Sequence, residues 1–476
     1  MRTLSHIERD GFYLPVVAVL LATGVALRLV NLSAGGLWLD EIWSMHHSAS
    51  WLSFAEVYSH AARDTHPPLF DLMLHGWLRI FGDGDLAGRS FAVLWSVLGL
   101  IATWRYAKLL TGSRLIALAA LALTSLHFFH IYYATEVRFY SMMYVLALGA
   151  LSHGYMVFAK ANWKHGLAVV MYLVLLCYTH YYGVLLSVAI GFTAVVLALF
   201  RKEYRRGAFR VMLCVCAVAV LFAPWIPVMF SGVPSDIWIE KPVIWLFPEY
   251  LYRYSGKNPV EFLFWIAGMA MAFLWGKRFF PLQGWLLGLA VLGFCVPFIA
   301  SFVLLPLLHE RYTVIYLPAL ILLVAIGWAG VSQAAKTWRL AIWAVWVLSV
   351  GVNLIWFNTH FQQPEKEPWK SMAGTIAELD PKGELPVVAE LDMYISYYLQ
   401  KLDRQAAATE ADGENAFFVV ITPYNKESLP SEWTLVETLD FGNGFRVLRV
   451  HSEGSGRTSS VGPSTSSTWQ QSWRSK

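Results

Sequence analysis

Long apolar stretches separated by short polar segments occupy the first three-quarters of the chain. A helix needs about 20 apolar residues to cross the hydrocarbon core of a bilayer. This pattern predicts eleven membrane-spanning helices, near residues 13–32, 88–110, 114–133, 138–158, 165–181, 183–200, 208–230, 260–275, 280–305, 312–332 and 338–357. We therefore expect an all-α polytopic membrane domain over residues 1–357, with residues 33–87 as its first outer loop.

The apolar stretch 66–82 differs from these spans. It begins with two prolines, is shorter than a span, and contains the ionisable residues Asp71, His75 and Arg79. We predict a helix that lies in the membrane interface rather than across the bilayer.

The pattern changes after residue 357. Short apolar runs bounded by turn residues predict strands at 384–391, 416–422, 433–439 and 445–450, and helices at 371–379 and 393–402. We expect a small C-terminal α/β domain over residues 358–450. Residues 451–476 are rich in Ser, Thr and Gly, which predicts a disordered tail.

The composition agrees with a membrane protein and excludes other classes. Of the 476 residues, 57% are hydrophobic and 14% charged, whereas a soluble domain is roughly a quarter charged. A net charge of +4 with no basic patch argues against nucleic-acid binding. The four cysteines form no metal-binding or disulfide spacing. The sequence also contains no Gly-rich nucleotide-binding loop, which argues against an ATP-driven transporter.

Basic residues give the orientation. With a cytoplasmic N-terminus and eleven spans, the inner loops contain 16 Lys and Arg and the longer outer loops before residue 358 contain 8, as the positive-inside rule requires. Counting 66–82 as a span would place the basic segment 201–210 outside. Charged residues are nearly absent from the predicted spans, and Arg28 is the clear exception. It lies near the outer end of the first span, where we expect its side chain to reach the membrane interface.

Acidic residues gather on the outer side, and a pair of them opens the first outer loop. Asp40 and Glu41 follow the first span and are flanked by Trp38 and Trp43. One explanation is structural, since acids stabilise a helix N-terminus. The other is functional, because a carboxylate close to the bilayer carries a desolvation cost and can act as a general base.

Four further motifs fall on the same predicted side. Together the motifs supply imidazoles, guanidiniums, carboxylates and phenols at one membrane depth. Each motif taken alone also has a structural explanation, as a turn, an ion pair or a helix start. Arg311 stands at a helix start, where a cation and free backbone N–H groups together suit an anion. The candidate donor-phosphate or substrate-binding residues are His66, Glu136, Arg138, Tyr140, His180, His309, Glu310, Arg311 and Tyr312.

At these residues the chain resembles a known family. It is similar to the polytopic C-type glycosyltransferases that use polyprenyl-phosphate sugars, notably bacterial relatives of the protein O-mannosyltransferases and the aminoarabinose lipid A transferases. The matching segments are 38–41, 66–69, 89–91, 133–141 and 310–312, with a further match at 368–373 after the last span. The set and its order are specific, although no single segment is.

The resemblance implies a mechanism and a location. Asp40 would deprotonate the acceptor, which attacks the anomeric carbon with inversion, while His66, Arg138 and Arg311 hold the departing polyprenyl phosphate. Glu41 would orient Asp40 or bind the acceptor. His66 stands where some relatives carry lysine. The family implies a multi-pass protein of the bacterial cytoplasmic membrane that acts on a glycan, lipid or protein acceptor. Divalent-metal use varies among relatives, so it stays open here, and no residue is assigned to a metal.

Two other functions fit the same pattern. A flippase or transporter for a lipid-linked sugar would need polar residues through the bilayer midplane and, often, broken helices. A polysaccharide polymerase or ligase would use a lipid-pyrophosphate glycan as donor. Sugar transfer without translocation, and the number of phosphates on the donor, separate these functions.

Overall fold

The computed structural model describes residues 10–30, 32–33, 35–231, 239–275, 279–304, 306–331, 336–358, 366–389, 391–402, 416–423 and 433–452. The chain forms two compact units. The first contains Met1–Leu32, Ser50–Val233 and Ile239–Gln362, and the second contains Ser33–Ala49, Pro234–Trp238 and Gln363–Lys476. The second unit therefore joins the start of the first outer loop to the C-terminal part of the chain. The domain boundaries expected at residues 357 and 450 stay predictions, and most of the tail lies outside the described residues.

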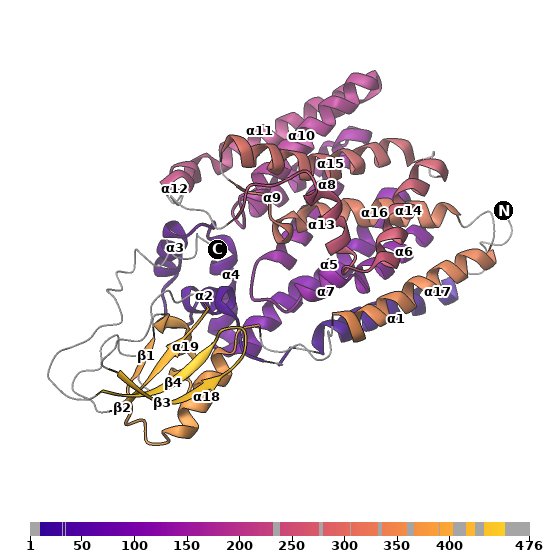
Figure 1. The fold of residues 1–476 in the computed structure, drawn as a ribbon. Helices are drawn as coiled ribbons and strands as arrows, with labels where there is room; N and C mark the ends of the chain where they lie inside the picture. Colours follow the sequence, from indigo (N-terminus) through magenta and orange to yellow (C-terminus); the bar gives the residue numbers. More distant parts are fainter. Residues whose placement is uncertain are drawn as a thin grey trace. The chain divides into compact units, whose positions relative to one another are not determined.

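The first unit is helical throughout its described part (Figure 1). Its α-helices are α1 (Asp10–Leu29), α3 (Phe54–Arg63), α4 (Leu69–Phe81), α5 (Asp85–Thr111), α6 (Arg114–Ser125), α7 (Phe128–Tyr132), α8 (Tyr140–Lys160), α9 (Gly166–Cys177), α10 (Tyr182–Phe200), α11 (Arg205–Phe222), α12 (Ile226–Ser231), α13 (Leu246–Tyr254), α14 (Pro259–Trp275), α15 (Phe280–Val303), α16 (Leu317–Gly330) and α17 (Lys336–Val352). Short 3₁₀ helices are η1 (Trp163–His165), η2 (Lys202–Tyr204), η3 (Ala223–Trp225) and η5 (Glu310–Tyr316), and a π-helical turn, η7 (Asn353–Phe357), follows α17.

The helices agree with the predicted spans. By length and composition, seven described helical segments can cross a membrane, and four apolar helices at 114–125, 163–177, 259–274 and 341–357 are shorter. Each predicted span overlaps one of these eleven segments, which confirms an all-α polytopic membrane protein with a small C-terminal sheet. The helix predicted at 66–82 is α4, with 13 residues; its position in the interface stays a prediction.

Burial distinguishes inner from outer helices of the first unit. Helices α8 and α16 are buried over most of their length, whereas fewer than a third of the residues in the apolar segments of α1, α11 and α15 are buried. The exposed side chains include large apolar ones such as Leu167, Phe200 and Val220, each more than 70% exposed. A soluble protein would not leave so much apolar surface in water, so these faces are suited to contact lipid.

Arg28 corrects one expectation. Its side chain is completely buried and does not reach an interface. The guanidinium donates to the carbonyl oxygens of Thr124 and Ser125, each at 3.1 Å, and to Ser96 Oγ at 2.7 Å, and it lies 2.8 Å from His130 Nδ1. Ser125 is the last residue of α6, so Arg28 supplies donors and positive charge to carbonyls at a helix C-terminus.

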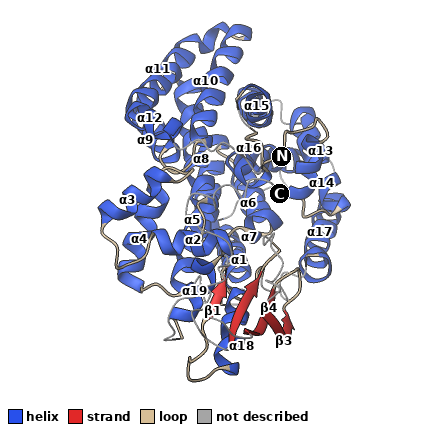
Figure 2. Cartoon of the chain, turned by 60° about the vertical axis from the view of Figure 1, so that its left-hand side comes forward, coloured by secondary structure: helices blue, strands red, loops and turns tan. Residues whose placement is uncertain are grey.

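The second unit contains the only sheet among the described residues (Figure 2). Its strands are β1 (Val387–Ala389), β2 (Ala416–Ile421), β3 (Trp433–Asp440) and β4 (Arg446–Ser452), in the order β1-β2-β4-β3. β1 pairs with β2 in parallel, and β4 pairs antiparallel with both β2 and β3. The four predicted strands are confirmed to within a few residues.

Three helices accompany the sheet in the second unit: α2 (Leu39–His47), α18 (Trp369–Leu379) and α19 (Asp392–Gln400). Trp369 is completely buried; it stacks on Tyr394 of α19 at 5.6 Å between ring centroids and meets Phe445 edge-on at 5.5 Å. The predicted helices at 371–379 and 393–402 are confirmed. Trp369 therefore anchors α18 in the core of the small domain.

Candidate functional site

Four side chains from distant parts of the first unit meet in one cluster, which we call the imidazole cluster: His66, Phe139, His180 and Tyr312. The His66 ring lies 4.9 Å from Phe139, 5.2 Å from His180 and 6.4 Å from Tyr312, between ring centroids. His180 lies 4.6 Å from Tyr312 and 4.8 Å from Phe139. Three predicted site residues therefore converge around a ring that was not predicted.

His66 is held by its neighbours on both sides. Its Nδ1 lies 3.0 Å from Thr65 Oγ1 and 3.7 Å from a carboxylate oxygen of Asp64. The proline pair that follows starts α4, and the N–H of Leu69 donates to the carbonyl oxygen of Tyr178 at 2.9 Å. That bond ties the start of α4 to the turn that carries His180, which fixes the two imidazoles near each other.

The charge of Asp64 follows from these contacts. Burial acts to raise the pKa of its carboxyl, but the hydrogen bond and charge of His66, the Thr65 N–H and the charge of Arg138 outweigh burial and lower the pKa well below its usual range. Asp64 is therefore ionised at neutral pH. It supplies a negative charge 3.7 Å from His66 Nδ1.

Two guanidiniums are placed on consecutive aromatic residues. The Arg138 guanidinium carbon lies 4.8 Å from the centre of the Phe139 ring, and Arg311 donates to the Tyr140 hydroxyl at 3.3 Å. Phe139 and Tyr140 are 2% and 1% exposed, so their rings are fixed by packing. An aromatic face attracts the Arg138 guanidinium, and the hydrogen bond to Tyr140 holds the Arg311 guanidinium beside the imidazole cluster.

His180 lies in the tight turn between α9 and α10. A side chain at Gly183 would place its Cβ 2.5 Å from the backbone nitrogen of Cys177, so the turn needs glycine there. His180 Nδ1 accepts the N–H of Tyr182 at 3.1 Å. The neutral ring therefore carries its proton on Nε2, and that N–H has no hydrogen-bond partner among the residues that the structure describes.

The segment before η5 is equally constrained. Ser301 Oγ accepts the N–H groups of Leu307 and Leu308 at 2.9 and 3.1 Å, and the Tyr182 hydroxyl donates to the Leu307 carbonyl at 2.7 Å. His309 Nδ1 then accepts the N–H of Arg311 at 3.4 Å. The backbone N–H expected to be free for an anion is thus directed at His309, while the Arg311 guanidinium stays beside Tyr140.

Burial keeps two of the imidazoles neutral. Burial and the charges of Arg311 and Arg253 lower the pKa of His309 to about 3. Burial and the charges of His66 and Arg138 lower the pKa of His180 well below its usual range. At neutral pH His180 is therefore a hydrogen-bond donor rather than a cation, and positive charge in the site comes from Arg138 and Arg311.

Two predicted acids have other surroundings. Glu310 accepts a hydrogen bond from Arg253 at 2.5 Å, and Arg253 also pairs with Glu249. Glu136 is 3% exposed, and its carbonyl oxygen accepts the Arg138 N–H at 2.6 Å. The Glu310 carboxylate thus pairs with Arg253, and the backbone carbonyl of Glu136 holds the backbone of Arg138.

Asp40 and Glu41 belong to the second unit, in the first turn of α2. Glu41 is buried, and its carboxylate accepts the N–H of Trp38 at 3.2 Å. That contact caps the helix, so the structural explanation holds for Glu41. Asp40 is half-buried. The N–H of Leu39 donates to Glu367 at 2.9 Å, and Glu367 also accepts from the Trp369 indole at 2.7 Å, so the C-terminal domain holds the start of α2.

Four residues with a part in these arrangements were not predicted: Asp64, Phe139, Arg253 and Glu367. Asp64 precedes His66 by two positions, a spacing that was available in the sequence. The other three act through contacts between distant segments. Among the described residues, no group of three or more His, Cys, Asp or Glu side chains is arranged to hold a metal.

Comparisons with known proteins bear on the fold of the chain. Residues 65–230 match the family model described as dolichyl-phosphate-mannose-protein mannosyltransferase. The structure of ArnT from Cupriavidus metallidurans in the apo state matches with a TM-score of 0.61 and 14% sequence identity, over 91% of this chain and 97% of that one. The chain has the fold of the C-type glycosyltransferases. The resemblance indicated by the motifs is thereby confirmed.

Other comparisons extend this result. ArnT from the same organism bound to undecaprenyl phosphate matches with a TM-score of 0.58 and 15% identity, over 93% of this chain and 98% of that one. Arabinofuranosyltransferase AftD from Mycobacteria matches with a TM-score of 0.50 and 14% identity, over 92% of this chain and 42% of AftD. No curated protein matches the sequence. The region matched by the family model includes His66, Arg138 and His180 but neither Asp40 nor Arg311.

Proposed function

We propose that this protein is a glycosyltransferase that moves a sugar from a polyprenyl-phosphate donor to an acceptor at the outer face of the bacterial cytoplasmic membrane. The proposal places the N-terminus in the cytoplasm and the C-terminal domain outside, following the positive-inside count. Its acceptor is a glycan, a lipid or a protein with a nucleophilic hydroxyl or amine.

The observation that carries the proposal is the set of donors around the imidazole cluster. Arg138 and Arg311 are held on neighbouring aromatic side chains, and His180 Nε2–H has no acceptor among the described residues. A phosphate oxygen is a suitable acceptor for all three, since charge-assisted hydrogen bonds from guanidinium to phosphate are strong and directional. The solved ArnT structure with undecaprenyl phosphate supports a lipid phosphate as the ligand.

The transfer needs few catalytic groups. The Asp40 carboxylate takes the proton of the acceptor as the acceptor oxygen or nitrogen bonds to the anomeric carbon from the face opposite the leaving group. The bond between that carbon and the phosphate oxygen breaks, and its electron pair leaves with polyprenyl phosphate. The configuration at the anomeric carbon inverts. Arg138, Arg311 and His180 stabilise the phosphate charge that develops, which is the usual role of preorganised donors.

Substitution of Asp40 by Asn tests the base assignment. Asn keeps the size of Asp and cannot accept the proton, so we expect turnover of a polyprenyl-phosphate sugar to fall by about 10²–10⁴-fold, the usual contribution of a general base. Asp392→Asn is the matched control, because Asp392 is exposed in the first turn of α19 of the same unit. Undiminished turnover by a folded D40N protein would refute the assignment.

The same assay separates this function from the two alternatives. Purified protein in detergent has no two sides to translocate between, so transfer of sugar in detergent excludes a function limited to flipping the lipid. Matched donors with one or two phosphates distinguish a polyprenyl-phosphate glycosyltransferase from a polymerase or ligase. Turnover only with the pyrophosphate donor would replace the proposal with that alternative.

A further inference from the structure

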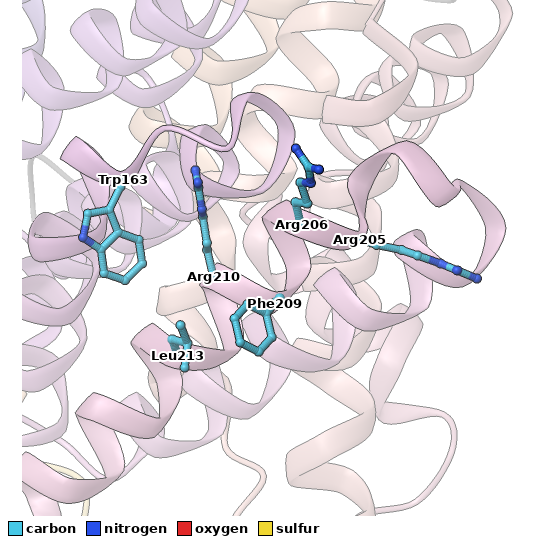
Figure 3. A pocket seen from close by; sticks show the side chains of 6 residues that line it. All are labelled: Trp163, Arg205, Arg206, Phe209, Arg210 and Leu213. Atoms are coloured by element: carbon cyan, nitrogen blue, oxygen red, sulfur yellow. The ribbon is translucent and has the colours of Figure 1, made fainter.

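A second group of basic side chains surrounds a cavity of about 590 Å³ in the first unit (Figure 3). It is lined by Trp163, Arg205, Arg206, Phe209, Arg210 and Leu213, and we call it the basic pocket. All of its residues except Trp163 belong to the first half of α11. None of them belongs to the candidate site described above.

The basic pocket and the imidazole cluster lie toward opposite ends of α11. Past the C-terminal end of the helix, the Trp225 indole donates to the hydroxyl of Tyr181, the neighbour of His180, at 3.3 Å. The pocket lies at the N-terminal end. Since α11 has 18 residues, the two ends are roughly 27 Å apart, close to the thickness of a hydrocarbon core. Under the predicted topology, the pocket falls at the membrane surface opposite the imidazole cluster.

Helix α11, which carries most of the pocket, packs closely on its neighbours. A Cβ atom at Gly207 would lie 1.8 Å from the carbonyl oxygen of Phe158, so α11 approaches the end of α8 as closely as its backbone allows. Cys214 Sγ lies 3.8 Å from the carbonyl oxygen of Gly166, which directly follows the turn containing Trp163. These contacts hold Trp163 beside α11 and keep the pocket formed.

The described residues do not neutralise the charges of the pocket. Arg201, just before α11, pairs with Glu203 at 3.8 Å. Arg205, Arg206 and Arg210 form no ion pair within the part of the chain that the structure describes. An inward-facing loop needs basic residues only for orientation, but three unpaired arginines around one cavity also provide a site for an anion.

Polar and apolar groups are segregated in the pocket. Figure 3 shows Arg206 and Arg210 extending upward from the helix, with Phe209 and Leu213 below them in this view. Arg206 and Arg210 are four residues apart, as are Phe209 and Leu213, and such pairs are neighbours on a helix surface. Phe209 is 65% exposed, Leu213 45% and Trp163 54%, so an apolar surface adjoins the cations.

From this arrangement we infer that the basic pocket binds an anionic phospholipid. The phosphate lies between Arg206 and Arg210, and an acyl chain follows Phe209 and Leu213. A soluble phosphate compound would gain nothing from the exposed apolar side chains, whereas a lipid in the adjacent leaflet presents both groups at this spacing. Basic pockets between transmembrane helices are known sites for anionic head groups.

The test compares lipid retention by variants of the full-length protein. Purified protein is supplied with phosphatidylglycerol and phosphatidylcholine of identical chains, and bound lipid is counted by native mass spectrometry. We expect preferential retention of phosphatidylglycerol, and roughly 30-fold weaker binding of it by R206Q/R210Q, since each basic residue near the surface contributes about 1 kcal/mol. The control R105Q/K108Q removes two exposed charges from the same predicted face and should retain the lipid.

Two further measurements make the result decisive. F209S/L213S keeps the cations and should weaken phosphatidylglycerol binding, while 10 mM inorganic phosphate should not displace the lipid; displacement would identify a site for free phosphate and overturn the inference. The inference would also be overturned if the unsubstituted protein retained both lipids equally, or if R105Q/K108Q and R206Q/R210Q lost equal amounts of phosphatidylglycerol. The arginines of the pocket would then serve only to orient the protein in the membrane. Sugar transfer by R206Q/R210Q should stay within about twofold, so this test is independent of the proposed function.

Discussion

The imidazole cluster of the first unit and helix α2 of the second unit are built in different ways. His66, Phe139, His180 and Tyr312 come from four distant segments, and every one of them is fixed by ring packing or a backbone hydrogen bond. Asp40 lies on a nine-residue helix whose first turn is capped by Glu41 and held by Glu367 of the C-terminal domain.

This difference indicates a division of labour. Groups suited to a phosphate are embedded in the helical bundle, which keeps them rigid, and the proposed base depends on a domain that follows the last predicted span. Leaving-group binding and acceptor activation should therefore respond separately to substitution. The predictions below test that separation.

After Asp40→Asn, the largest effect is expected for Arg311→Gln. Its guanidinium, held beside Tyr140, would lose the charge that stabilises the departing phosphate, so we expect kcat for sugar transfer to fall by about 10²–10³-fold, as for removal of one preorganised donor. Binding of undecaprenyl phosphate should weaken in parallel, which isothermal titration or lipid retention can measure.

Arg63→Gln is the control for that substitution, because Arg63 is exposed on the same predicted side and bonds only to Ser59 in the described structure. Normal turnover by a folded R311Q protein would remove Arg311 from the proposed site. Loss of turnover with unchanged affinity for undecaprenyl phosphate would show that the guanidinium acts only in the transition state.

A smaller and more selective effect is expected for Glu367→Ala. The Leu39 N–H at the start of α2 would lose its acceptor, and a shift of about 1 Å in a catalytic group can cost 10²-fold. We expect kcat to fall by about 10–100-fold while affinity for undecaprenyl phosphate stays within twofold. Glu367→Gln retains an acceptor oxygen and should restore most of the turnover. If Glu367→Ala instead weakened lipid binding as much as Arg311→Gln does, the two regions would not be separable.

The sequence contains enough information for the helices and for three candidate residues, His66, His180 and Tyr312, that the structure brings together. Apolar runs of about 20 residues identify the spans because lipid exposure imposes composition directly, and the four motifs of the first unit were predicted to share one membrane depth because they fall on the same side of the topology. The strands at 416–421 and 433–440 were visible as short apolar runs between turn residues.

Long-range partners could not be predicted in the same way. Leu39 and Glu367 are separated by 328 positions, and no local pattern marks a carboxylate as the cap of a remote helix. Arg28 looked free to reach the interface, since the carbonyls of Thr124 and Ser125 that surround it carry no sequence signal. The His309 ring receives the Arg311 N–H for a similar reason: whether an N–H is free depends on the conformation of the preceding residue.

The smallest expected effect concerns pH and stability, and it separates the buried site from the exposed surface. The unfolded chain protonates His309 near pH 6.5 and the folded protein only near pH 3. Stability from this group is therefore complete above about pH 6.5 and declines as the pH falls toward 3, by about 1.4 kcal/mol per unit, or about 2 kcal/mol between pH 7.5 and 5. His180 acts in the same direction.

His309→Gln should reduce the slope of unfolding free energy against pH by nearly one proton, measured by chemical denaturation in detergent. His46→Gln, at an exposed position of α2, is the control for replacing a histidine outside the buried site. Equal slopes for the unsubstituted protein and H309Q would mean that His309 takes up its proton in the folded state, which would make it a third cation beside Arg311 rather than a neutral support for it.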